Sequence, residues 1–308
     1  MSPLRSATAP IKSSFNGAVN FVHWQPVKKF ATVTVIGRDK TGVIARVTNF
    51  LFEQHANIEA LEEQVTRGQF SMTLQASWKD GQLSPIQLER GLTDLGFALK
   101  MEIKVRFTTA NQRQRMAILV TRETHCFAGL MRSFKTGHFK QAEPAIVIGN
   151  RPEFAALAKA HKLKFVHIPW IERAEAEGKL IKLLEEHHID FMVLARFMKI
   201  LSPNVVWRFK NKIINVHPSL LPSFPGAQAY RQAYEHGVKI AGVTAHFVSM
   251  HLDEGPIIAQ ESFTIKPNWG IKEIVAAGQK RESKVLVKAV KLYLSKHLDV
   301  YWGTVKQV

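Results

Sequence analysis

An amide, an imidazole and a carboxylate lie in positions where they could act together on a carbonyl group. Asn215 and His217 end an apolar run that begins at Ile213, and because side chains alternate along a strand, both should project from one face. Pro218 then interrupts the strand. Asp253 lies 36 residues beyond His217, in the turn-like sequence Leu-Asp-Glu-Gly-Pro. Acyl transfer needs such groups: a donor to a developing oxyanion, an imidazole beside it, and a carboxylate that orients or deprotonates the attacking group.

The elements expected around these residues belong to a doubly wound α/β domain. Short apolar runs alternate with helical patterns, and this alternation predicts a mainly parallel sheet whose active site lies at the carboxyl ends of its strands. The expected strands cover residues 116–121, 145–148, 165–168, 191–195 and 212–216, with a further apolar run at 240–248 and a short strand at 299–302. The expected helices cover residues 127–134, 153–161, 171–187, 202–209 and 271–297.

The first part of the chain follows a different plan. Its patterns give the order βαββαβ, the ferredoxin-like arrangement, with a hairpin at Arg67-Gly68. The expected strands cover 30–36, 60–65, 70–78 and 98–107, and the expected helices cover 43–51 and 84–95. Residues 108–115 are polar and lack apolar periodicity. We therefore expect a basic N-terminal arm at 1–29, a small α/β domain at 30–110 and a catalytic domain at 111–308.

The stretch 212–260 resembles the formyltetrahydrofolate-dependent formyltransferases and hydrolases. The resemblance rests on the pattern Asn-x-His-Pro-Ser-Leu-Leu-Pro at 215–222, on Gly226, on the strand that carries His246, and on the turn Leu-Asp-x-Gly-Pro-Ile at 252–257. It implies a formyltransferase fold for the second domain, with no metal and no cofactor, and formyl-folate as the substrate. The catalytic residues it implies are Asn215, His217 and Asp253, and the substrate-binding residues are Arg196, Met198, His246, Ser249 and Leu252.

The first domain resembles an ACT domain, which senses small molecules or pairs with a copy of itself. This implies either an amino-acid effector, at the turn from Gly37 to Gly42, or a purely dimerising role, and in both cases a homo-oligomer. An ACT domain before a formyltransferase domain resembles the formyltetrahydrofolate deformylases, which hydrolyse 10-formyltetrahydrofolate to tetrahydrofolate and formate. The alternative is transfer of the formyl group to an amine, as in the phosphoribosylglycinamide formyltransferases, because Pro218 stands where many deformylases have a second histidine.

Composition limits the classes of protein and of binding partner that remain. The 308 residues are 46% hydrophobic and 22% charged, which is typical of a globular protein. The net charge of +17 favours acidic partners, but the basic residues are spread over the chain, so no nucleic-acid partner is expected. No apolar run is long enough for a membrane span. The lone cysteine, Cys126, suits a reducing compartment, and we expect a cytoplasmic location, with residues 1–29 compatible with a flexible arm or a transit peptide.

Two further motif searches limit the chemistry. No G-x-G-x-x-G follows an expected strand and no G-x-S-x-G is present, which excludes a nicotinamide dehydrogenase and a serine hydrolase of the elbow type. His246, His251 and Asp253 lie too far apart along a strand and turn to be expected as metal ligands.

Overall fold

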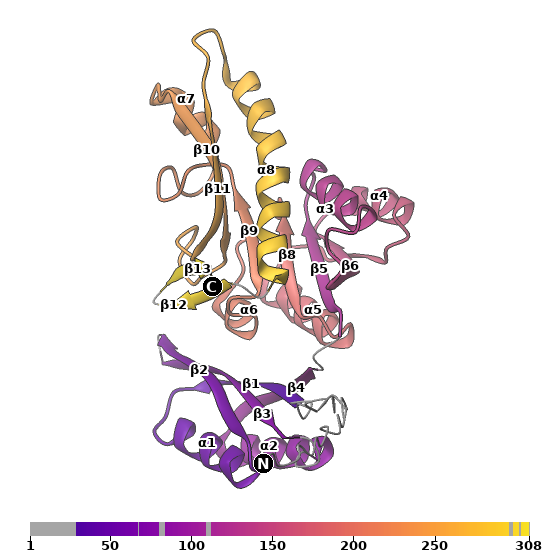
Figure 1. The fold of residues 1–308 in the computed structure, drawn as a ribbon, viewed down its shortest axis with the longest axis vertical. Coiled ribbons are helices and arrows are strands. Elements are labelled where there is room, and N and C mark those ends of the chain that lie inside the picture. Colours follow the sequence, from indigo (N-terminus) through magenta and orange to yellow (C-terminus); the bar gives the residue numbers. More distant parts are fainter. Residues whose placement is uncertain are drawn as a thin grey trace, which may run out of the picture.

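The computed structural model describes residues 29–66, 68–79, 84–108, 112–295, 298–301 and 303–307. Two sheets follow one another along the chain, a small one in the first domain and a larger one in the second (Figure 1). The basic arm expected at 1–29 lies outside the described residues except for Lys29, and so do Arg67 of the expected hairpin and Trp302 of the expected last strand.

The first domain has the expected βαββαβ order. Its four strands form an antiparallel sheet in the order β2-β3-β1-β4. The elements are β1 (Lys29–Arg38), α1 (Val43–Glu53), β2 (Asn57–Thr66), β3 (Gln69–Trp78), α2 (Pro85–Leu99) and β4 (Met101–Thr108). The prediction that the last strand begins at residue 98 is wrong. Leu99 is buried at helical spacing with Leu88 and Leu92, so α2 continues to Leu99 and β4 begins at Met101.

The two helices cover only one face of this sheet. Val33 and Val35 of β1 point into the core beneath α1 and α2, and the alternate residues Thr32 and Thr34 point to the other face. That other face is turned toward the second domain (Figure 1). The small domain therefore presents a polar sheet surface to the larger one.

The second domain contains a seven-stranded sheet in the order β11-β10-β9-β8-β5-β6-β7. The five strands β5 to β9 run parallel, while β10 is antiparallel to both β9 and β11. The strands are β5 (Gln114–Val120), β6 (Ala142–Gly149), β7 (Phe165–His167), β8 (Phe191–Ala195), β9 (Ile213–His217), β10 (Ile240–Phe247) and β11 (Ile257–Thr264). The helices are α3 (His125–Lys135), α4 (Ala155–Ala160), α5 (Arg173–Glu186), α6 (Pro203–Arg208), α7 (Ala229–Glu235) and α8 (Ile271–Leu294).

Helices cover both faces of this sheet. Along β5, Met116, Ile118 and Val120 pack with α3 and α8, while Ala117 and Leu119 pack with α5 and α6 on the opposite face. The domain is therefore the doubly wound, mainly parallel α/β fold expected from the sequence. From the central strand β5 the chain winds outward through β6 and β7 and then returns to place β8 on the other side of β5. Ligands bind at such reversals of strand order, at the carboxyl ends of the strands.

Three parts of the second domain differ from the sequence-based expectation. Neither β11 nor α7 was expected, because their short sequences carry no strong periodicity. The helix expected at 153–161 is a 3₁₀ turn, Pro152–Phe154, followed by α4. The strand expected at 299–302 is the first arm of a hairpin formed by β12 (Leu298–Tyr301) and β13 (Thr304–Gln307).

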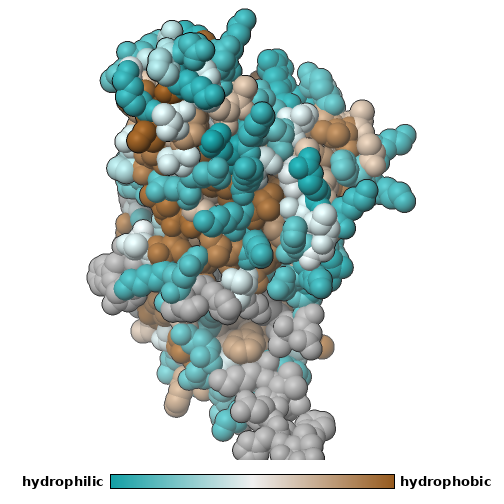
Figure 2. All heavy atoms as spheres, turned by 45° about the horizontal axis from the view of Figure 1, so that its top comes forward, coloured by the Kyte–Doolittle hydropathy of each residue, from teal (hydrophilic) through white to brown (hydrophobic). Residues whose placement is uncertain are grey.

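On the face shown in Figure 2, hydrophobic side chains gather in patches that hydrophilic side chains frame. Within the part of the chain that the structure describes, no helix combines the length and the apolar character that crossing a membrane requires.

Candidate active site

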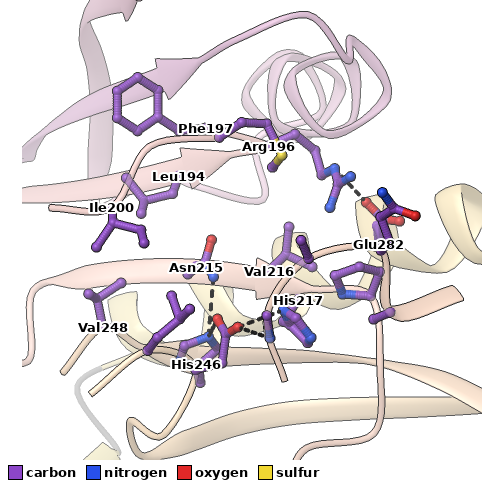
Figure 3. Close-up of a pocket in the computed structure, with 18 of the residues that line it drawn as sticks. Leu194, Arg196, Phe197, Ile200, Asn215, Val216, His217, His246, Val248 and Glu282 are labelled. Carbon is purple, nitrogen blue, oxygen red and sulfur yellow. Dashed lines mark hydrogen bonds and ion pairs between the residues drawn. The ribbon is translucent and has the colours of Figure 1, made fainter. Parts of the chain in front are cut away.

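A cavity of about 770 Å³ opens at the carboxyl ends of β8 and β9, beside the reversal of strand order. Asn215, at the middle of β9, and His217, at its end, both line the cavity, as expected from the alternation of side chains. Asp253 lines it from the loop between β10 and β11. The three residues implied by the resemblance therefore line a single cavity, and Figure 3 shows Asn215 and His217 in it.

The amide of Asn215 is held by its neighbour across the sheet. Asn215 pairs directly with His246 of β10, and its Nδ2 lies 3.2 Å from His246 Nε2. His246 Nδ1 lies 2.9 Å from the Phe247 carbonyl, which only accepts, so Nδ1 carries the proton and Nε2 accepts from Asn215. Burial lowers the pKa of His246 and favours this neutral form. One amide hydrogen of Asn215 is thus fixed on His246 and the other remains for a ligand.

The imidazole of His217 lies between two oxygen atoms. Its Nε2 donates to the Phe224 carbonyl at 2.9 Å, and its Nδ1 lies 3.2 Å from Asp253 Oδ2. Asp253 Oδ2 also accepts from the Gly226 N–H at 2.8 Å. The side chains of His217 and Asp253 are 5% and 7% exposed, so water does little to screen their interaction. The ring of His217 therefore connects the Asp253 carboxylate to the Phe224 carbonyl.

Tight backbone packing sets the position of Asp253. A Cβ on Gly255 would lie 1.7 Å from the Phe247 carbonyl oxygen, so only glycine lets the loop approach the end of β10 this closely. Phe247 N–H then donates to the Pro256 carbonyl at 2.9 Å and fixes the loop there. Asp253 itself has φ of 58°, a left-handed conformation that aspartate tolerates better than most residues.

The other end of the cavity is apolar. Leu194, Phe197, Ile200 and Val248 gather there, with Asn215 between them and the polar end (Figure 3). The expected substrate-binding residues Met198, Ser249 and Leu252 also line the cavity. Met198 and Leu252 are about half exposed, at 54% and 52%, so their apolar surface is open to a ligand in the cavity.

Arg196 lines the cavity but extends away from the apolar end (Figure 3). It follows directly after β8 with φ of 64°, and its Nε lies 3.3 Å from Glu282 Oε2 of α8. His125 Nε2 and Tyr230 Oη also donate to Glu282, at 2.9 and 2.8 Å. Burial alone would raise the pKa of Glu282, but the bond from His125 and the charge of Arg196 outweigh it and hold this pKa below its usual value. Glu282 is therefore a buried carboxylate at the end of the cavity opposite the apolar residues.

Sequence reasoning missed Glu282, Tyr230 and His125. A signal existed for Glu282, since an acidic residue at helical spacing from Val285 and Leu286 stands on the apolar face of α8. Nothing in the sequence indicated that Arg196, Tyr230 and His125, from three other segments, would meet it there.

His125, Cys126 and Glu282 offer ligand atoms within 4.8 Å of one another, the spacing of a metal site. The chemistry of the group does not fit one. Burial and the nearby Glu282 charge raise the pKa of the Cys126 thiol, which keeps it protonated. Glu282 Oε2 is already engaged by His125 and by the cation Arg196, which would repel a metal ion.

The turn after β5 completes this end of the cavity. Residues 121–127 contain no glycine. Glu123 of this turn lines the cavity and accepts from Gln279 of α8 at 3.1 Å. The turn therefore presents side chains, including an acid, where a phosphate site would present backbone N–H groups.

Comparison with known proteins agrees with this geometry. The model of the family described as formyl transferase matches residues 114–290, and the model described as ACT domain matches residues 29–108. Proteins of Escherichia coli named formyltetrahydrofolate deformylase are 38% identical over 269 residues, an alignment that covers 85% of this chain and 92% of theirs.

Two solved structures show how far the likeness extends. The crystal structure of a formyltetrahydrofolate deformylase from Pseudomonas syringae pv. tomato is similar with a TM-score of 0.62 at 27% identity, covering 92% of this chain and 96% of that one. Glycinamide ribonucleotide transformylase 1 from Symbiobacterium toebii is similar with a TM-score of 0.62 at 28% identity, covering 96% of its own chain but 66% of this one. The first likeness includes both domains, and the second leaves a third of this chain without a counterpart.

Proposed function

The chain belongs to the formyl transferase family and, within it, to the formyltetrahydrofolate deformylases, and we propose that Asn215, His217 and Asp253 carry out its reaction. The protein hydrolyses 10-formyltetrahydrofolate to tetrahydrofolate and formate, a step of one-carbon metabolism linked to purine biosynthesis. The observation that carries the catalytic assignment is the 3.2 Å contact of His217 Nδ1 with Asp253 Oδ2, in the cavity that the Asn215 amide also lines with one hydrogen left for a ligand.

Asn215 and His217 stabilise the charge that develops during attack. The attacking water oxygen bonds to the formyl carbon, and the carbonyl oxygen becomes an oxyanion. The free Nδ2 hydrogen of Asn215 donates to this oxygen, and because His246 fixes the amide in advance, little reorganisation is needed.

Asp253 moves the protons. Its carboxylate accepts a proton from the attacking water, and the pair formed with His217 then delivers a proton to the folate nitrogen as the carbon–nitrogen bond breaks. The water's oxygen leaves in formic acid, which ionises to formate and a proton, and the folate nitrogen gains one hydrogen, so atoms and charge balance. In this scheme the transition state is stabilised by side chains alone, and we include no metal or redox cofactor in it.

The apolar end of the cavity holds the folate rings in this proposal. Met198, Ser249 and Leu252 line the opening toward that end. The half-exposed Met198 and Leu252 would be covered by a bound ring system, and the Met198 backbone is fixed because its N–H donates to Thr121 Oγ1 at 2.9 Å. Arg196, whose charge is paired with Glu282, then acts at the far end of the cavity rather than along the rings.

Water rather than an amine is the acceptor in this proposal, and the test is a direct assay. Purified protein supplied with 10-formyltetrahydrofolate is expected to release formate, and added glycinamide ribonucleotide is expected neither to change that rate nor to become formylated. The ribonucleotide's phosphate would meet Glu123 and a turn without glycine, and the Arg196–Glu282 pair fills the same end of the cavity.

Formate and the formylated ribonucleotide are measured in the same reaction, so the two outcomes are separated. Formylation faster than hydrolysis would replace the deformylase by a transferase. If neither formate nor the formylated ribonucleotide forms and the substrate is not consumed, the catalytic assignment itself is contradicted.

The first domain provides the contact between subunits in this proposal, and the protein is a homo-oligomer. Leu61 and Val65 of the edge strand β2 pair with Leu74 and Phe70 and lie on the helix side of the sheet, yet they are 36% and 48% exposed. An exposed apolar edge strand is suited to pairing with a second copy. An amino-acid effector at residues 37–42 and a cytoplasmic location stay predictions.

Sedimentation equilibrium of the full chain tests the assembly. The expected mass is at least twice the 34.8 kDa of one chain. Leu61→Lys should lower that mass by placing a charge in the apolar contact, whereas Lys182→Met, far from β2 on α5, should not. A monomeric wild-type protein would contradict the proposal.

A further inference from the structure

A second cavity, of about 240 Å³, lies between the two domains. Its floor is the uncovered face of the small sheet. There Thr32 of β1 stands opposite Arg106 of β4, and Thr34 stands opposite Lys104. The opposite side of the cavity is formed by the second domain, namely by the end of α5, by α6 and by the residue before β9.

Ion pairs between the domains surround this cavity and use most of the charged side chains. Lys104 contacts Glu185 at 3.5 Å, and Arg106 contacts Asp190 at 2.9 Å. Arg106 also donates to the carbonyls of His188 and Ile189, which follow the end of α5. The remaining contacts are Arg208 with Glu102, and Lys210 with Glu62 at 3.1 Å.

Lys212 is the exception. It is half-buried and lines the cavity, but among the residues that the structure describes its ammonium group has no hydrogen bond and no ion pair. Asp190, the acid that attracts it from a distance, already accepts from Arg106 and from the Arg115 N–H. Burial and then repulsion by Arg106 lower the pKa of Lys212, so the site as it stands disfavours the charge it contains.

The charges around the cavity do not balance. The lining side chains include the cations of Lys104, Arg106, Arg208 and Lys212. The lining acids are Glu185 and Asp190, and Glu102 beside the cavity pairs with Arg208, so one cation, Lys212, is in excess. An excess of positive charge around a half-buried, unpaired ammonium is costly, and a bound anion would remove that cost.

The uncharged residues that line the cavity indicate which kind of anion would fit it. Ile181, Leu184 and Phe209 contribute apolar surface, and the hydroxyls of Thr32 and Thr34 have no hydrogen bond among the described residues. The volume is below the range of about 300–1,000 Å³ typical of sites for drug-sized ligands. A ligand of about the size of an amino acid, with one carboxylate and an aliphatic body, matches the charge, the walls and the volume.

We propose that this interdomain cavity is a binding site for a small aliphatic carboxylic acid, aliphatic α-amino acids included, whose carboxylate pairs with Lys212. The ligand would contact both domains at once. Lys212 directly precedes β9, its N–H donates to Phe209, and its carbonyl accepts from Met192 of β8 at 2.8 Å. Because Asn215 and His217 lie further along the same strand, occupancy of the cavity is placed to influence the rate of formate release.

The test uses the full-length protein, with L-leucine and 4-methylpentanoate as the probe acids and L-leucinamide and 4-methylpentanamide as their uncharged-carboxyl counterparts. At least one acid, at a hundredfold excess over its Kd, is expected to raise the melting temperature by about 5 °C, and its amide to raise it by less than about 1 °C. The acid is also expected to change the rate of formate release.

Two variants locate the site. Lys212→Met keeps the aliphatic stem but removes the charge, and should abolish the shift while leaving the melting temperature without ligand equal to wild type or higher, since an unpaired ammonium is lost. Lys182→Met, a 77% exposed lysine on α5, should respond to the acid as wild type does.

Either of two results overturns the proposal. The first needs no variant: neither acid raises the melting temperature of the wild-type protein, or the amides raise it as much as the acids do. The other is Lys212→Met protein that keeps the full shift. The assignment of Asn215, His217 and Asp253 stands or falls separately, because it is tested by formate release without any added acid.

Discussion

Asp253→Asn is expected to lower the rate of formate release by about 10²–10⁴-fold while the protein folds normally and still binds folate. The asparagine side chain has nearly the same shape. Its oxygen can take the place of Asp253 Oδ2, which accepts from the Gly226 N–H at 2.8 Å and lies 3.2 Å from His217 Nδ1. What it cannot do is accept a proton from water, so the loss should appear in kcat, with little change in the dissociation constant of a folate ligand.

Glu254→Gln is the matched control. Glu254 is the exposed neighbour of Asp253 in the same loop and does not line the cavity, so the same chemical change there should leave kcat within about twofold of wild type. Thermal unfolding of both variants shows whether the fold is kept. Wild-type-like formate release by Asp253→Asn would remove the general base from the mechanism.

That Asn215, His217 and Asp253 would lie together could be predicted from the sequence, because their placement depends on local rules. Strand alternation gives Asn215 and His217 a common direction, and the loop that carries Asp253 must follow the strand next to theirs. The βαββαβ order of the first domain and the parallel arrangement of the second could be predicted for the same reason, since apolar periodicity is local. The end predicted for α2, residue 95, was wrong by four residues, because the buried Leu99 extends the apolar face of the helix.

Features that depend on contacts between distant segments could not be predicted. Glu282 is bound by Arg196, His125 and Tyr230, which come from the end of β8, the start of α3 and α7. No local sequence pattern marks any of these residues as a partner of a buried carboxylate. Lys212 is similar, since only the docking of the two domains leaves its ammonium without a partner.

The role of His246 also depends on a contact between separate segments, its contact with Asn215 across the sheet. The resemblance implied a substrate contact for it, and that remains untested. The structure adds a second task, because His246 Nε2 lies 3.2 Å from Asn215 Nδ2 and is kept as an acceptor by the bond from Nδ1 to the Phe247 carbonyl. The pKa of His246 lies below its usual value, so the ring stays neutral as pH falls until that lowered pKa is reached. Protonation below it would remove the acceptor and free the Asn215 amide to rotate.

Asn215→Ala should therefore lower kcat by about two to three powers of ten, with folate affinity nearly unchanged. The free amide hydrogen contributes only when the carbonyl oxygen becomes an oxyanion, so its removal acts on the transition state and not on the bound substrate. Asn204→Ala, on the exposed side of α6, is the control and should have no effect on kcat. Stopped assays for formate give kcat, and fluorescence titration with a folate ligand gives affinity. If affinity fell by as much as kcat, Asn215 would be a residue of substrate recognition, and stabilisation of the oxyanion would fall to His217 alone.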